Sequence, residues 1–317
     1  MDVHQFRCGD RVERGAVLAV GAFDAIHPGQ IKIIQEGRRQ ADRLGAPLGV
    51  LSLEPHPRRL LQPPTGPFAL VTRDQAVRAL RALGVDKFYI LTFDQTISRM
   101  SHDEVSRQIW RDTLGIRHIV ASTGLTYGSD RLGTSAQLEE EGERYGFGVS
   151  LTQPQVASNG QVCSSGAVRR LLSAGRVGDV PMLFGRPFAI EGAVQHGAKL
   201  ARAIGFPTAN IPLGEYARPL AGIYASITML PDGRRLPSLS YVGRRPTVDG
   251  GEERLEVFLF DFDEELYGQQ IETALLEFVR PDQKFSSLED MQNQMKDDFA
   301  QGRSISFAVD PKGLFLR

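Results

Sequence analysis

The chain has 317 residues, of which 41% are hydrophobic and 24% are charged. That length is too great for one ordinary core, so we expect two globular, water-soluble domains. A chain with a formal net charge of −1 does not attract nucleic acid or an anionic membrane over a distance. Any phosphates would therefore be bound by a few local Arg, Lys and backbone N–H groups. Two cysteines make neither a disulfide framework nor a zinc site, and no apolar run is long enough to span a membrane. A reducing, cytoplasmic location is therefore expected.

The first half of the chain alternates predicted strands and helices. Short apolar runs predict strands at residues 17–20, 48–53, 88–91 and 116–121, and helical spacing of apolar residues predicts helices at 31–44, 73–83 and 103–114. Such alternation is typical of a parallel sheet with helices on both faces, which binds ligands at the carboxyl ends of its strands. We therefore predict a Rossmann-like α/β domain over residues 1–180.

The second half has short alternating patterns separated by Gly and Pro turns. Strands are predicted at residues 188–195, 223–229, 239–242, 255–261 and 271–278, after two short joining helices at 169–172 and 177–183. This pattern predicts a small antiparallel β-barrel over residues 181–317. Residues 288–301 predict an amphipathic helix that packs on the barrel through Met291, Met295 and Phe299.

Residues 203–210 read AIGFPTAN and follow a basic run that contains Gly197. Pro207 fixes φ and so predicts a tight turn. Thr208 and Asn210 lie two apart, so in an extended segment both side chains point to one face. A hydroxyl and an amide oxygen are ligands of the kind that Mg²⁺ takes beside nucleotide phosphates. On residue types alone, a Pro turn followed by an Asn cap explains this stretch equally well.

The run GFPTAN matches the signature of riboflavin kinases in all six residues. Other family elements surround it, including LFGRP at 183–187, GIY at 222–224, GRRPT at 243–247 and LYG at 266–268. The whole chain resembles the bacterial bifunctional riboflavin kinase/FMN adenylyltransferases, also called FAD synthetases. This resemblance implies that the barrel transfers the γ-phosphate of ATP to the 5′-hydroxyl of riboflavin and yields FMN.

The resemblance also implies roles for individual residues of the barrel. Thr208 and Asn210 would bind Mg²⁺ and the ATP phosphates, and Glu256 would be the general base for the ribityl hydroxyl. The remaining expected contacts are ATP phosphates at Gly197, Lys199, Arg202 and Pro207, and flavin at Arg280 and Phe285. On pattern alone, a surface carboxylate on an exposed strand face is the favoured interpretation of Glu256, and the surrounding family match makes it the minority one.

Residues 21–30, GAFDAIHPGQ, join the first predicted strand to the first helix and resemble the GxFDGxHxGH motif of nucleotidylyltransferases. In that family both histidines contact ATP phosphates and stabilise the attacked α-phosphate. His27 is present, but Gln30 replaces the second histidine and Ala25 replaces the glycine. A glutamine can donate a hydrogen bond but supplies no positive charge. An alternative of equal weight is that His27 only caps the helix.

Two further ligand-facing elements of this half depart from the family. The GxDFxFG loop aligns with residues 122–128 (STGLTYG), which lack the acid, the first aromatic and the usual basic residue. The SSTxxR element aligns with Ser164, Ser165 and Arg169 but has Gly166 in place of Thr, whereas His56 in the PHP element does match. Together these changes predict an adenylyltransferase remnant that keeps its fold and has lost much or all of its activity.

Our main prediction is thus a riboflavin kinase that uses ATP and Mg²⁺ and has a weakened or lost FMN adenylyltransferase site. Two alternatives stay open. The first is a fully bifunctional enzyme that also makes FAD. The second is a non-catalytic, flavin-binding regulatory protein. The combined presence of Thr208, Asn210 and Glu256 argues against the second, because a pure binder need not keep metal ligands and a base together.

Overall fold

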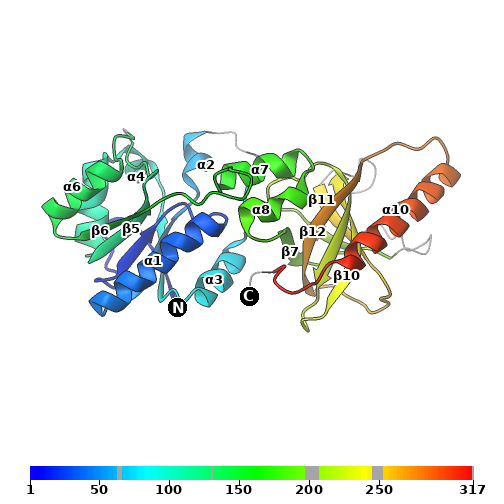
Figure 1. The fold of residues 1–317 in the computed structure, drawn as a ribbon, viewed down its shortest axis with the longest axis horizontal. Helices are drawn as coiled ribbons and strands as arrows, with labels where there is room; N and C mark the ends of the chain where they lie inside the picture. Colours follow the sequence, from blue (N-terminus) through cyan, green and yellow to red (C-terminus); the bar gives the residue numbers. More distant parts are fainter. Residues whose placement is uncertain (63–65, 130, 197–206, 245–252, 316–317) are drawn as a thin grey trace. The chain divides into compact units, whose positions relative to one another are not determined.

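The structure is a computed structural model that describes residues 1–62, 66–129, 131–196, 207–244 and 253–315. It forms two compact units, which we describe separately (Figure 1). Unit 1 comprises Met1–Gly66 and Arg73–Ser164, and unit 2 comprises Pro67–Thr72 and the chain from Ser165 onward. The division at residue 180 expected from sequence differs from this one, because the short helices after Ser164 contact the barrel.

Unit 1 is built on a six-stranded sheet in the order β1-β4-β3-β2-β5-β6, and all its pairings are parallel. Its strands are β1 (Asp2–Phe6), β2 (Val17–Val20), β3 (Leu48–Glu54), β4 (Lys87–Thr92), β5 (His118–Ser122) and β6 (Gly148–Thr152). The predicted Rossmann-like domain is confirmed. The strand order reverses between β2 and β5, and ligands bind at such a switch point in open α/β sheets.

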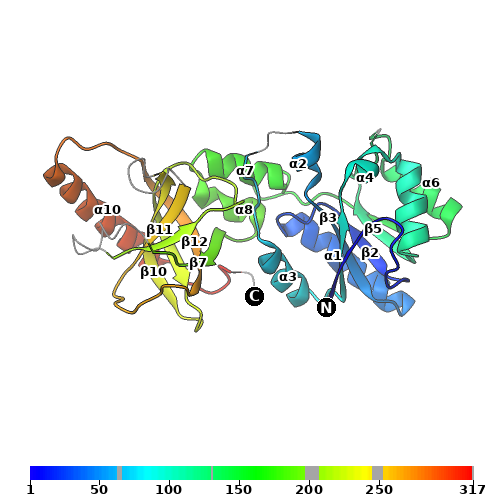
Figure 2. The ribbon, with the colours of Figure 1, turned by 180° about the vertical axis from the view of Figure 1, so that it is seen from behind.

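Helices cover this sheet. They are α1 (Pro28–Leu44), α2 (Pro57–Leu61), α3 (Arg73–Ala82), α4 (Gln95–Arg99), α5 (His102–Glu104), the π-helix η1 (Val105–Thr113) and α6 (Ser135–Tyr145). Helix α1 packs along β2, β3, β5 and β6, and α6 packs on η1 and β6 (Figure 2). The helix predicted at 103–114 is present, but most of it is π-helical: the N–H of Leu114 donates to Ile109 O at 2.9 Å.

Unit 2 contains a six-stranded antiparallel sheet in the order β7-β12-β9-β10-β11-β8. Its strands are β7 (Phe188–Ala193), β8 (Ala209–Pro212), β9 (Gly222–Met229), β10 (Arg235–Arg244), β11 (Glu253–Leu259) and β12 (Gln270–Pro281). An antiparallel bridge joins Gln195, just beyond β7, to Asn210 on β8 and nearly closes the sheet. The predicted small antiparallel barrel is thereby confirmed.

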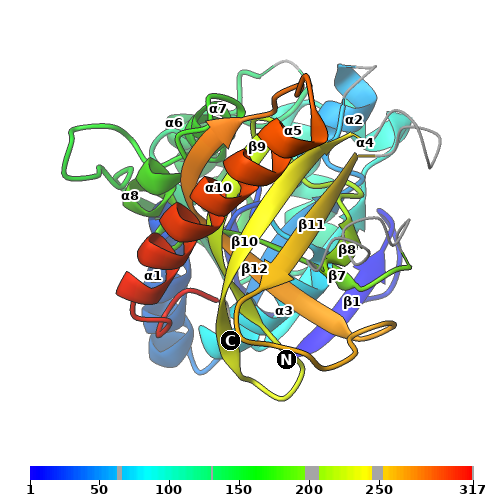
Figure 3. The same cartoon turned by 90° about the vertical axis from the view of Figure 1, so that its right-hand side faces the viewer.

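Helices flank the barrel at both ends of its sequence. They are α7 (Ser165–Ser173), the 3₁₀ turn η2 (Val177–Asp179), α8 (Val180–Phe184) and the terminal helix α10 (Leu288–Ala308). Helix α10 lies across β9, β10 and β12 (Figure 3). Its Phe299 ring meets Phe258 edge-on with 4.6 Å between centroids. The predicted amphipathic helix is confirmed and is longer than expected.

Candidate active sites

Strand register in the barrel brings two of the predicted residues together, with a third next to them in the chain. Glu256 on β11 pairs with Asn210 on β8, and Thr208 lies two residues before Asn210. Residues that face each other across two strands present their side chains to one face, as do residues two apart along a strand. Asn210 is 9% exposed and Glu256 is 6% exposed, so neither is the surface side chain that the residue pattern alone also allowed. The Asn210 amide and the Glu256 carboxylate therefore share one buried patch, and partly buried Thr208 directly precedes β8.

The donor set of this patch fits a hard cation. The Nδ2 of Asn210 donates to Thr208 O at 3.2 Å, which leaves the amide oxygen out of that bond. The backbone carbonyl of Asn210 accepts from Gln195 N at 2.8 Å, so the bridge that closes the barrel also holds this residue. Hydroxyl, amide and carboxylate oxygens are the ligand types that Mg²⁺ prefers. Thr208 and Asn210 are thus suited to hold it, and the Glu256 carboxylate opposite Asn210 is placed to act as a base.

The predicted phosphate loop is described only at its ends. Gly197, Lys199 and Arg202 lie outside the described residues, whereas Pro207 is exposed directly before Thr208. On the other side of the loop, His196 lies against the Tyr267 ring with 3.9 Å between centroids. Sequence reasoning missed Tyr241, which pairs with Glu256 from β10 and donates to Asp282 Oδ2 at 3.2 Å. Only the pairing of β10 with β11 identifies it.

Arg280, predicted to hold flavin, makes a two-pronged ion pair with Asp298 of α10. Its Nε and Nη2 lie 2.8 and 2.7 Å from the two carboxylate oxygens. Asp298 is only 3% exposed, and the Arg280 guanidinium also lies 5.6 Å from the centroid of the Phe285 ring. Arg280 therefore ties α10 and Phe285 to the end of β12. Direct contact of Arg280 or Phe285 with flavin stays a prediction.

In unit 1, His27 caps helix α1. Its Nδ1 accepts from Gly29 N at 3.1 Å and from Gln30 N at 3.4 Å, and the Gln30 side chain accepts from His27 N at 3.1 Å. This reciprocal pair is a capping box. Because Nδ1 is an acceptor, a neutral His27 ring carries its proton on Nε2. Capping thus uses Nδ1 of His27, and in the neutral ring Nε2 is the nitrogen that can donate.

The turn before His27 is held in an unusual backbone conformation. Phe23 and Ile26 have positive φ values of 42° and 54°, and both are buried. A β-branched residue in this region is strained, and such strain is found mainly at functional sites. Ala25, by contrast, does not adopt a positive φ. An alanine therefore fits where the related motif has glycine, and that departure leaves the turn intact.

His56 repeats the arrangement of His27 at the start of α2. Its Nδ1 accepts from Arg58 N at 3.2 Å, so its Nε2 is again the protonated nitrogen in the neutral ring. This Nε2 lies 3.9 Å from Asp24 Oδ2, within the turn that contains His27. Asp24 is not among the predicted site residues, although its place in the GAFDAIHPGQ motif is a sufficient signal for it.

The altered loop at residues 122–128 begins at the carboxyl end of β5, next to β2, and the His27 turn begins at the carboxyl end of β2. Both elements therefore start at the switch point of the sheet. Leu125 and Tyr127 pack against the core of unit 1, and Gly128 keeps the positive φ of 79° that favours glycine. The loop has changed its side chains and kept an ordered backbone.

The element that resembles SSTxxR, with Ser164, Ser165 and Arg169, is divided between the units. Ser164 belongs to unit 1, whereas Ser165 and Arg169 belong to unit 2. Within unit 2, Arg169 Nε donates to Phe68 O at 2.7 Å and the guanidinium lies 5.1 Å from the centroid of the Phe68 ring. These contacts give Arg169 a structural role in fixing residues 67–72.

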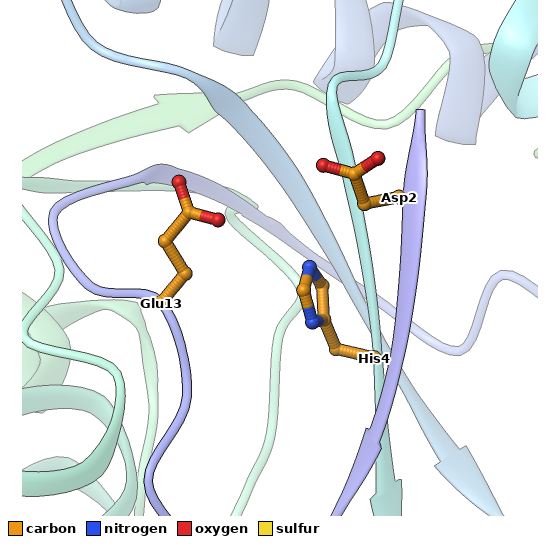
Figure 4. Close-up of side chains that lie close together, drawn as sticks. All are labelled: Asp2, His4 and Glu13. Carbon is orange, nitrogen blue, oxygen red and sulfur yellow. The ribbon is translucent and has the colours of Figure 1, made fainter.

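A group of possible metal ligands, Asp2, His4 and Glu13, lies elsewhere in unit 1 (Figure 4). Asp2 and His4 come from β1 and face Glu13 on the following loop. The Lys87 ammonium lies 2.8 Å from Asp2 Oδ2 and 2.6 Å from Glu13 Oε2. These ion pairs raise the pKa of Lys87. A resident cation side chain makes this an ion-pair cluster and not a metal site.

Comparisons with known proteins match both halves. The riboflavin kinase family model matches residues 184–306, and the FAD synthetase model matches residues 10–166. A bifunctional riboflavin kinase/FMN adenylyltransferase of Pseudomonas fluorescens is 37% identical over 92% of this chain and 94% of its own. The Escherichia coli protein of the same name is 32% identical over 94% of this chain and 95% of its own.

The fold is also found among solved structures. A protein described as a macrolide-efflux protein from Streptococcus pneumoniae shares it, with a TM-score of 0.83 and 26% identity, over 95% of this chain and 98% of that one. Among the described residues of this chain, no helix is both long and apolar enough to cross a bilayer.

These matches cover the N-terminal half as well as the barrel, and nothing in them shows that the first half is weakened. They favour the fully bifunctional alternative over our main prediction of a weakened or lost adenylyltransferase. The chain belongs to the family of bifunctional riboflavin kinase/FMN adenylyltransferases, transferases that use ATP, Mg²⁺, riboflavin and FMN.

Proposed function

We propose that this chain phosphorylates riboflavin in unit 2 and adenylylates the resulting FMN in unit 1. The observation that carries the first activity is the pairing of Glu256 with Asn210 across β11 and β8. This pairing of a buried carboxylate with one of the two expected metal ligands joins residues far apart in sequence and supports the proposal. A non-catalytic flavin binder has no need of this arrangement.

In the kinase reaction, Glu256 accepts the proton of the ribityl 5′-hydroxyl as that oxygen attacks the γ-phosphate. Thr208 and Asn210 would hold Mg²⁺, and the bound ion would supply positive charge to neutralise the transferred phosphoryl group. Phosphoryl transfer depends on positioning and electrostatic stabilisation more than on covalent chemistry of the protein. The rigid strand register supplies that positioning, and the low exposure of Asn210 and Glu256 limits access of water.

In the adenylyl transfer, His27 and His56 donate hydrogen bonds from Nε2 to the phosphates of ATP. Both rings are oriented by backbone N–H groups that bond to Nδ1. The amino-terminal end of α1 adds backbone N–H groups and a favourable helix dipole for an anion. Gln30 completes the cap that fixes His27. This support for His27 is the reason to propose that unit 1 retains activity despite its altered motif.

Incubation with riboflavin and MgATP, followed by chromatographic separation of the flavins, tests both parts of the proposal. We expect FMN and then FAD. Thr208→Ala and Asn210→Ala should each remove most FMN formation while the fold persists, because the metal ligands are lost. FMN supplied in place of riboflavin should still yield FAD in both variants, which makes the second reaction an internal control.

The other outcomes separate the alternatives. FMN without FAD would contradict the proposal for unit 1 and restore our original prediction of a lost adenylyltransferase. Unchanged riboflavin would contradict the proposal for unit 2. If it is accompanied by flavin binding in equilibrium dialysis, it would favour the regulatory protein.

A further inference from the structure

Unit 1 contains a buried carboxylate that neither motif includes. Glu141 on α6 is 2% exposed and accepts hydrogen bonds from three side chains. His102 Nδ1 lies 2.5 Å from Oε1, the Tyr127 hydroxyl lies 2.6 Å from Oε2, and the Ser106 hydroxyl also bonds to Oε2. The three partners come from α5, from the loop after β5 and from η1. A buried carboxylate is tolerated only when donors of this kind satisfy it.

One of these partners, Tyr127, belongs to the altered loop at residues 122–128. Its N–H donates to Gly133 O at 3.0 Å, and its ring lies 4.9 Å from the centroid of Trp110. A Cβ at Gly133 would approach the Tyr127 ring to 2.8 Å and His102 Cβ to 2.6 Å, so the aromatic ring is closely enclosed. Burial and the bond to Glu141 raise the pKa of Tyr127, so the hydroxyl stays protonated and remains a donor.

The hydroxyl of Tyr127 is a departure from the related loop pattern, GxDFxFG, which has phenylalanine at this position. The same loop lacks the acid and the first aromatic of that pattern. A phenylalanine could make no bond to Glu141, which would then keep only the bonds to His102 and Ser106 among the three described above. The tyrosine hydroxyl therefore gives this loop a bond to α6 that a phenylalanine at the same position would lack.

We propose that the loop at residues 122–128, which starts at the switch point of the sheet, contacts FMN in the adenylyltransferase site, and that Glu141 is a positioning residue that acts on this loop through the hydroxyl of Tyr127. This inference rests on the proposed function of unit 1. The bond fixes one end of the loop to α6, which packs on β6 and on η1. A loop that is ordered before the flavin arrives loses less entropy when the flavin binds.

The test compares two variants, each of which lacks one tyrosine hydroxyl that donates to a carboxylate. Tyr127→Phe breaks the bond to Glu141, and Tyr145→Phe breaks a 2.7 Å bond from α6 to Asp103 Oδ1 in the same unit. Glu141→Gln is the partner variant, since an amide oxygen cannot satisfy all the donors that the carboxylate accepts. The readouts are the KM for FMN, the KM for ATP, kcat for FAD formation, and hydrogen exchange of the amides at 122–128.

We expect Tyr127→Phe and Glu141→Gln to raise the KM for FMN about tenfold, because each change loses the charge-assisted hydrogen bond that orders the loop before FMN binds. The kcat and the KM for ATP should stay nearly unchanged. Exchange at residues 122–128 should quicken, while exchange in β2 and β3 stays slow and shows that the unit is folded. Tyr145→Phe should change neither. A Tyr127→Phe variant with an unchanged KM for FMN and unchanged loop exchange would overturn the inference.

A wild-type chain that forms no FAD would contradict the proposed function of unit 1 separately. Hydrogen exchange at residues 122–128 then tests whether the Tyr127–Glu141 bond orders the loop. Quicker exchange in Tyr127→Phe than in Tyr145→Phe supports this role, and equal exchange overturns it.

Discussion

The two units hold their candidate residues in different ways. In unit 2, Asn210 and Glu256 sit opposite each other in strand register, so the backbone pairing itself sets their geometry. In unit 1, His27 and His56 lie at helix starts beyond the ends of strands and are oriented by side-chain caps. A site built in strand register tolerates few changes of residue type. A site built on caps and loops can exchange residues while its backbone persists.

This difference explains why the sequence alone suggested decay in unit 1. Ala25 replaces glycine at a position where the backbone does not need one, and Gln30 replaces histidine at a position where its side chain completes a capping box. Each change removes a familiar residue from the motif. Neither change disrupts the turn that presents His27.

The largest expected effect tests the register of unit 2. Glu256→Gln should lower kcat for FMN formation by about 10²–10⁴, because the carbonyl oxygen of an amide is too weak a base to accept the proton. Initial rates with saturating riboflavin and MgATP measure this change. FAD formation from supplied FMN serves as the control and should not change. Near-normal FMN formation would show that another group is the base.

The next effect tests whether unit 1 contains a working adenylyltransferase site in which His27 takes part. His27→Ala should lower FAD formation from FMN and MgATP by about 10²–10³, the usual loss when one donor to a charged transition state is removed. FMN formation from riboflavin should be unchanged in the same preparation. If the variant makes FAD at the wild-type rate, His27 has only its capping role.

A smaller effect concerns the support of the barrel site by α10. Arg280→Lys should lower the free energy of unfolding of unit 2 by about 1.5–3 kcal/mol, because a lysine cannot make both charge-assisted bonds to Asp298. Urea titration followed by FMN-forming activity measures the shift. Arg303→Lys, at the more exposed pair with Asp261, is the matched control and should shift it far less. Equal shifts would mean that the Arg280 pair contributes little.

The smallest effect concerns the residue that most strongly suggested decay. Gln30→His should change FAD formation by about tenfold or less, because the position is 5% exposed and already contributes one hydrogen bond to the His27 cap. Rates from FMN and MgATP measure it against Gln30→Ala, which removes the cap partner. A gain of about 10²–10³ on Gln30→His would mean that a missing donor had limited the reaction.

Local pattern was sufficient for much of the fold. The strand at residues 17–20 and the helix that ends at Leu44 were predicted from hydrophobic periodicity, and the structure confirms them. Strands β1 and β6 were not predicted, because β1 is largely exposed and β6 half-buried, so neither shows a strong apolar alternation. The π-helical form of η1 was also missed, since it depends on backbone hydrogen bonds that residue types do not encode.

The sequence by itself determined the family resemblance, the two fold classes and the identity of Thr208, Asn210 and Glu256 as candidates. Motifs and periodicity are local, so they can be read without knowing which segments meet. Only the tertiary structure decided that Glu256 is buried opposite Asn210, that Arg280 is committed to Asp298, and that Tyr127 bonds to Glu141. These contacts join different strands, helices and loops, so local sequence patterns do not reveal them.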